Sequence, residues 1–95
     1  MVSADRNKLK KALEKERELY KQRNPKSFEL FNSANNLFGK VPMTWMNKWA
    51  GGFPIYLDWA KGNTVFSVDG HSYIDFALGD TTAMAGHSPE QVGEA

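Results

Sequence analysis

The stretch from Gly51 to His87 has the sequence GGFPIYLDWAKGNTVFSVDGHSYIDFALGDTTAMAGH. It holds three short runs of β-branched and aromatic residues, which are typical of strands. The runs are separated by two turn signals, Lys61-Gly-Asn63 and Asp69-Gly70, of which Asp-Gly is the stronger hairpin signal. The pattern predicts strands over 53–59, 65–68 and 73–78, joined as an antiparallel meander, and a loop of small residues over 79–86.

Two helices are expected ahead of the meander. Ser3 is expected to cap the first, with Asp5 in its first turn. Asn24-Pro25 should end it, because the residue before a proline avoids helical angles. Ser27 is expected to cap the second helix and Gly39 to close it. The second helix should turn its apolar residues toward a core: Phe28, Leu30, Phe31, Ala34, Leu37 and Phe38.

A third helix is expected to start at Ser88-Pro-Glu-Gln91, with a capping serine and proline at the first helical position. This start signal lies close to Ala95, so we expect the polypeptide to continue beyond it. The elements together predict an α+β segment with two helices followed by a three-stranded antiparallel meander.

Composition excludes several classes of function. The chain has 95 residues, a net charge of +1 and no cysteine, so it offers no disulfide and no thiolate nucleophile. This charge is too close to neutral to indicate a nucleic-acid partner or a membrane partner. The sequence shows neither a signal peptide nor an apolar stretch of membrane-spanning length. We therefore expect a cytoplasmic protein without a metal site.

Charge is concentrated in the first helix. Between Ala4 and Arg23 there are eight Lys or Arg residues and four Asp or Glu residues. The preferred interpretation is a solvated helix lying on a larger body. A basic helix that binds nucleic acid is the alternative, but Glu14, Glu16 and Glu18 interleave with the lysines and argue against it.

Two loops are candidates for a site. The segment 41–50 is apolar without periodicity, and Pro42 forbids a regular helix there, so it either folds over a core or lines a pocket. In the second loop, residues 79–86, Asp80 either bonds nearby backbone amides or faces a cavity. His87 is expected to bond backbone groups at a turn, and Asp75 has no partner at general acid–base spacing.

Taken in order, these pieces resemble the N-terminal region of the class III pyridoxal-phosphate-dependent aminotransferases, the group that includes glutamate-1-semialdehyde aminomutase. The resemblance runs from about Ser27 to Ala95. It rests on the order and spacing of Ser27-Phe-Glu-Leu-Phe31, Gly51-Gly52 with Pro54, Val68-Asp-Gly70, Tyr73-Ile-Asp75 and Gly86-His87.

The resemblance implies that this α+β segment precedes a large cofactor domain of the fold type I (α/β) transferases. It also implies a homodimer. In the implied reaction an amino group moves from a small-molecule donor onto pyridoxal 5'-phosphate and then to a carbonyl acceptor. The phosphate-binding turn and the Schiff-base lysine are expected beyond Ala95, so no catalytic or cofactor-binding residue is assigned within this chain.

The resemblance further implies that the loops 41–50 and 79–86 reach the active site. It assigns substrate contacts to Thr44 and Trp45 in the first loop and to Asp80 and Thr81 in the second. Aminomutase-like members often place an arginine before the Gly-Gly pair, where it clamps a substrate carboxylate. No arginine occurs from Asn24 to Ala95, and Thr44 or Trp45 falls near its place.

We expect two parts: a charged N-terminal helix over 1–26, and over 27–95 the start of the small segment of an aminotransferase. The function expected is that of an aminotransferase or aminomutase whose large domain is absent from this chain, which alone should be inactive. The alternative from another class is a complete, non-enzymatic helix-plus-meander module that binds a partner.

Overall fold

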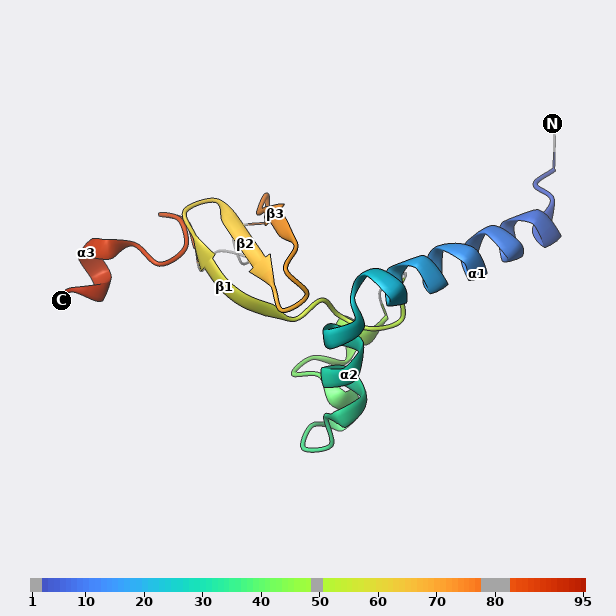
Figure 1. Ribbon diagram of the computed structural model, residues 1–95, viewed down its shortest axis with the longest axis horizontal. Coiled ribbons are helices and arrows are strands. Elements are labelled where there is room, and N and C mark those ends of the chain that lie inside the picture. Colours follow the sequence, from blue (N-terminus) through green and yellow to red (C-terminus); the bar gives the residue numbers. More distant parts are fainter. Residues whose placement is uncertain (1–2, 49–50, 78–82) are drawn as a thin grey trace. The chain divides into compact units, whose positions relative to one another are not determined.

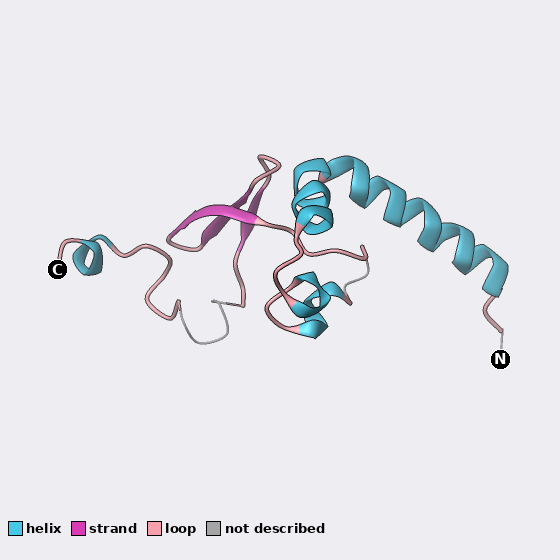
Figure 2. Cartoon of the chain, turned by 90° about the horizontal axis from the view of Figure 1, so that it is seen from below, coloured by secondary structure: helices cyan, strands magenta, loops and turns pink. Residues whose placement is uncertain are grey.

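The computed structural model describes residues 3–48, 51–77 and 83–95 (Figures 1 and 2). The chain divides into two compact units, Met1–Ile55 and Tyr56–Ala95. The described part of the first unit is helical, with α1 (Arg6–Arg23), α2 (Pro25–Ser33) and the short 3-10 helices η1 (Phe38–Lys40) and η2 (Thr44–Asn47). The second contains the strands β1 (Leu57–Lys61), β2 (Thr64–Ser67) and β3 (Ser72–Ile74) and the short helix α3 (Glu90–Gly93).

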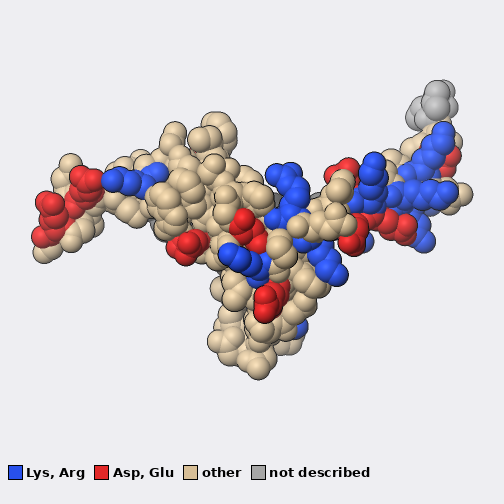
Figure 3. Space-filling view, in the orientation of Figure 1, with Lys and Arg blue, Asp and Glu red and all other residues tan. Residues whose placement is uncertain are grey.

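Helix α1 ends at Arg23, with Asn24 as its C-cap, as the Asn24-Pro25 signal predicted, but the predicted Ser3 cap is wrong. Asp5 is the N-cap, and its carboxylate accepts hydrogen bonds from the backbone N–H groups of Asn7 and Lys8, at 3.0 and 3.2 Å. A carboxylate suits this end better than a hydroxyl because its negative charge also interacts favourably with the positive end of the helix dipole. Basic side chains lie along α1 with acidic side chains among them (Figure 3). Every α1 residue except Tyr20 is exposed.

Helix α2 begins and ends earlier than predicted. Asn24 precedes it and Pro25 occupies its first turn, where a proline loses no hydrogen bond, so Ser27 lies inside the helix and is fully buried. The helix stops at Ala34, whose ψ of 121° is extended. The hydroxyl of Ser33 donates to the carbonyl of Leu30, a local bond of the kind that weakens helices. Leu37 and Phe38 are therefore exposed instead of facing a core.

Phe53 forms the centre of the first unit, and this corrects the predicted strand over 53–59. It is 3% exposed and its ring packs against Tyr20, Phe28 and Phe31, with centroid separations of 4.7, 5.3 and 6.5 Å. Burial among helical side chains takes Phe53 out of the sheet. The first strand accordingly begins at Leu57.

The predicted antiparallel meander is confirmed. The strand order is β1-β2-β3 and both pairs are antiparallel. Both predicted turns are present, and their glycines, Gly62 and Gly70, adopt φ angles of 59° and 84° that favour glycine. The third strand is shorter than predicted: Phe76 lies beyond it and is 92% exposed, and the predicted Leu78 lies outside the described residues.

The last described segment ends in the predicted third helix, but with a different start. Pro89 is the N-cap of α3, and Ser88 adopts a φ of 48°. The hydroxyl of Ser88 donates to the carbonyl of Ala60 at 2.8 Å instead of capping the helix. This bond ties the segment before α3 to β1.

Candidate functional site

Thr44 and Trp45 lie together in η2, inside the loop that the sequence assigned to the active site. Both are exposed, Trp45 by 53%, whereas Val41 at the start of the loop is only 3% exposed. The described part of the loop, 41–48, therefore packs inward through Val41 and presents Thr44 and Trp45 outward. Trp45 contributes exposed apolar surface there, without a charge.

Polar contacts from the preceding turn hold this loop. The Nδ2 atom of Asn47 donates to the carbonyl of Gly39 at 2.9 Å, and Nζ of Lys40 donates to the carbonyl of Asn32 at 3.0 Å. Gly39 and Lys40 have φ angles of 71° and 66°, so the chain reverses sharply before Val41. The φ of Gly39 favours glycine, and an ideal Cβ there would also lie 3.3 Å from Asn47 Nδ2, which would have to shift slightly.

The other two predicted substrate contacts, Asp80 and Thr81, lie outside the described residues. Their assignment stays a prediction. The ends of their loop are described, at Asp75–Ala77 and Ala83–His87.

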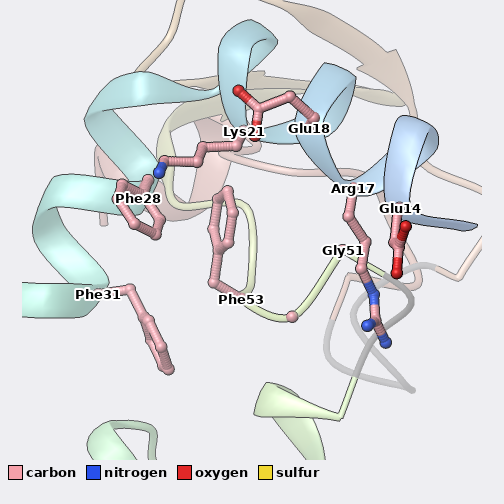
Figure 4. A pocket seen from close by; sticks show the side chains of 9 residues that line it. Glu14, Arg17, Glu18, Lys21, Phe28, Phe31, Gly51 and Phe53 are labelled. Atoms are coloured by element: carbon pink, nitrogen blue, oxygen red, sulfur yellow. The ribbon is translucent and has the colours of Figure 1, made fainter.

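An apolar pocket of about 390 Å³ opens beside the C-terminal half of α1 (Figure 4). Phe28, Phe31 and Phe53 gather on one side of it, and Glu14 and Arg17 lie on the other. The remaining lining residues are Glu18, Lys21, Gly51 and Gly52. The pocket brings together apolar rings and surface charges, with Lys21 Nζ 4.4 Å from the centre of the Phe28 ring.

The sequence did not predict the contacts of Tyr20 with Gly51 and Phe53. The hydroxyl of Tyr20 donates to the carbonyl of Phe53 at 3.0 Å. The backbone of Gly51 lies so close to the Tyr20 ring that an ideal Cβ on Gly51 would overlap ring atoms. The available signal was an aromatic residue near the end of a charged helix, but the partners of Tyr20 are more than thirty residues away in sequence.

A second contact missed by the sequence joins His87 to Asp75. Nε2 of His87 lies 2.5 Å from Oδ2 of Asp75, and the two side chains are only 21% and 13% exposed. The main chain of His87 pairs in both directions with Gly62, at 2.8 and 3.0 Å. The adjacent Ser88 hydroxyl is engaged by Ala60, so it is not aligned as a nucleophile for the histidine. The pair therefore fastens the loop end to the meander.

The predicted absence of an internal Schiff-base lysine from this chain stays a prediction. Every lysine lies in the described part, and none is buried. A working Schiff-base lysine sits in a desolvated site that lowers its pKa.

Among the described helices, none combines the length and the apolar character needed to cross a bilayer.

Comparison with known proteins identifies relatives of this segment. The chain is 35% identical over 66 residues to the glutamate-1-semialdehyde 2,1-aminomutase of Saccharolobus islandicus, and 37% identical over 68 residues to that of Anaeromyxobacter sp.. Each match covers 70% of this chain and 16% of the relative, so the chain spans about a sixth of the relatives' length. No family model matches the chain.

Solved structures extend the similarity to the fold. A glutamate-1-semialdehyde aminomutase from Pseudomonas aeruginosa aligns with 98% of this chain and 21% of its own, with a TM-score of 0.80 and 29% identity. A variant of that enzyme was solved in complex with PMP. A β-phenylalanine aminotransferase from Variovorax paradoxus, at 24% identity and a TM-score of 0.78, shares the fold. The predicted resemblance to the pyridoxal-phosphate-dependent aminotransferases, and to glutamate-1-semialdehyde aminomutase among them, is confirmed in both sequence and fold.

Proposed function

We propose that this chain is the N-terminal part of a class III, pyridoxal-phosphate-dependent aminotransferase or aminomutase. Residues 1–26 would supply a charged helix and residues 27–95 the start of the small segment. The observation that carries the proposal is the aminomutase fold shared over 98% of the chain at a TM-score of 0.80. Such an enzyme transfers an amino group between an amino acid or amine and a carbonyl acceptor.

The cofactor would be bound by the part of the enzyme beyond Ala95. The residues present do not fit it, because no lysine is buried and the sequence has no glycine-rich phosphate loop. PMP in a similar structure supports the cofactor class for the whole enzyme. We assign no chemical step to this chain, which alone should be inactive. We further propose a cytoplasmic homodimer, as expected for the family.

On the substrate side, we propose that Thr44, Trp45, Asp80 and Thr81 contribute. The exposed position of Thr44 and Trp45 on a loop held at Gly39 and Val41 supports the first two. A non-enzymatic interaction module is not favoured, since the matched relatives are enzymes.

The proposal is tested on the full-length protein purified with pyridoxal phosphate. Two assays are needed: amino-group transfer from a panel of α-amino acids, β-amino acids and plain amines to a carbonyl acceptor, and isomerisation of glutamate 1-semialdehyde. We expect activity in at least one. A folded, cofactor-loaded protein that is inactive in both would overturn the proposal.

A further inference from the structure

We propose that Tyr20 is a positioning residue for the loop segment 41–48, through which it tunes substrate choice. The inference rests on the proposed function, because Thr44 and Trp45 matter only if this loop meets a substrate. Tyr20 lies before Ser27, outside the stretch that carries the sequence resemblance. The proposal therefore gives α1, which composition describes only as charged and solvated, a part in positioning the loop segment 41–48.

Tyr20 makes several contacts that join α1 to the rest of its unit. It is the one residue of α1, a helix lying wholly in the described part, that is not exposed. Its carbonyl accepts hydrogen bonds from the backbone N–H and side-chain Nδ2 of Asn24, at 3.1 and 2.9 Å. Asn24 is itself 3% exposed and precedes α2. These bonds fix the position of the Tyr20 backbone relative to α2.

The Tyr20 side chain then fixes the chain that follows the loop. Its hydroxyl donates to the Phe53 carbonyl at 3.0 Å, and the two rings pack with centroids 4.7 Å apart at 48°. Gly51 lies against the ring so closely that any Cβ would overlap it. Tyr20 thus makes three separate contacts with this segment. It forms a hydrogen bond and a ring pair with Phe53, and its ring packs closely against the backbone of Gly51.

The same loop is fixed at its other end without Tyr20. Val41 is buried, Lys40 just before it donates to the main-chain carbonyl of Asn32 in α2, and Asn47 donates to the carbonyl of Gly39 in the preceding turn. A segment held at both ends has fewer accessible conformations than one held at a single end. Loosening the Gly51–Phe53 end should therefore spread the positions of Thr44 and Trp45, while leaving the Val41 end in place.

The test uses the full-length enzyme with Tyr20→Phe, which keeps the ring and removes the hydroxyl, and Gly51→Ala, which forces the ring away. Leu19→Ala is the matched control, because Leu19 is the neighbouring apolar residue of α1 and is 41% exposed. One readout is the ratio of kcat/KM for an α-amino acid to that for a plain amine. The other is amide hydrogen exchange of a peptide covering 41–48.

We expect Tyr20→Phe to change the kcat/KM ratio by about two- to tenfold, the range for loss of one hydrogen bond, and to speed exchange over 41–48. Gly51→Ala should change both further, and Leu19→Ala neither. An unchanged ratio in an active enzyme, or unchanged exchange over 41–48, would show that Tyr20 only stabilises the fold. If the parent enzyme were inactive, the proposed function would fail and exchange alone would still decide the positioning role.

Discussion

Asp75, just before the loop 76–86, and His87, just after it, form a side-chain pair. Nε2 of the imidazole lies 2.5 Å from Oδ2 of the carboxylate. Asp75 is engaged from three sides: its other oxygen accepts from the backbone N–H of Ala77 at 2.9 Å, and its own N–H donates to Asn63 at 2.8 Å. Because an ionised carboxylate only accepts, the contact requires His87 to present Nε2–H. This pair joins the end of the meander to the residues just before α3.

Breaking this pair should loosen the meander locally. We expect His87→Asn or Asp75→Asn in the full-length protein to speed hydrogen exchange at the Gly62 and His87 amides. A charge-assisted bond contributes about 1.5–3 kcal/mol, which corresponds to roughly 10- to 150-fold faster exchange where local opening controls it. Mass spectrometry of peptides covering 60–67 and 83–90 measures the change.

The double variant separates a direct contact from two independent effects. If the residues act as a pair, the double variant should exchange little faster than either single variant. Asp58→Asn serves as a control, since Asp58 is exposed on β1. Effects that simply add would show that the 2.5 Å contact contributes nothing to stability.

The sequence predicted those parts of the fold that depend on local chemistry. The turn at Asp69-Gly70 requires a positive φ that glycine supplies without strain, so the second hairpin could be read directly. The end of α1 at Asn24-Pro25 follows from the same kind of local constraint. In both cases the residues that decide the conformation are neighbours in the chain.

The errors occur where distant contacts override local preference. Phe53 has strand-like neighbours, yet burial against Tyr20, Phe28 and Phe31 takes it into the helical unit. Of the candidate site, the sequence predicted the loop that contains Thr44 and Trp45. It did not predict the role of Tyr20, because Gly51 and Phe53 come into contact with Tyr20 only when the folded chain returns to α1.

The chain of residues 1–95, prepared alone, should be loosely packed or should aggregate. Among the described residues, the buried apolar set is small: Val41, Phe53, Val65 and Ala83. Trp59 stacks on Phe66 at 3.7 Å but remains 52% exposed, and Phe38 and Phe76 are 89% and 92% exposed. So much exposed aromatic surface favours association.

Calorimetry and binding of a hydrophobic dye measure this property. We expect a broad, weakly cooperative transition together with strong dye binding. A sharp melt of a soluble monomer that binds no dye would contradict the prediction and would favour a self-contained module.

The isolated chain should form no specific adduct with pyridoxal phosphate. Its lysines are exposed or, for Lys40, partly exposed, so none has the desolvated setting that makes a lysine reactive at neutral pH. Borohydride reduction followed by peptide mapping should show partial labelling spread over several lysines. Stoichiometric labelling of one lysine would place a cofactor site within these residues.

In the full-length enzyme, Trp45 and Asp80 should set substrate choice near the place where the sequence resemblance implies an arginine. Charge-assisted bonds to a carboxylate contribute about 1.5–3 kcal/mol each, and no arginine is available from Asn24 to Ala95. Trp45 offers apolar surface without charge, and Asp80, if it faces the cavity, repels a carboxylate and attracts a cation or a donor. The enzyme should therefore hold a substrate carboxylate elsewhere or prefer amines without one at that end.

Steady-state kinetics of Trp45→Ala and Asp80→Asn on α-amino acids, β-amino acids and plain amines test this assignment. Asp80→Asn removes a negative charge without changing size, so kcat/KM for carboxylate-bearing substrates should rise relative to plain amines, by about tenfold for each 1.4 kcal/mol of repulsion relieved. Trp45→Ala should weaken the bulkier apolar substrates most, because it removes the exposed face of η2. Asp58→Asn, the same substitution at an exposed position on β1, should leave the ranking unchanged. If both loop variants keep the parent's substrate ranking and lose only stability, the two residues support the fold and the carboxylate is recognised by the remainder of the enzyme.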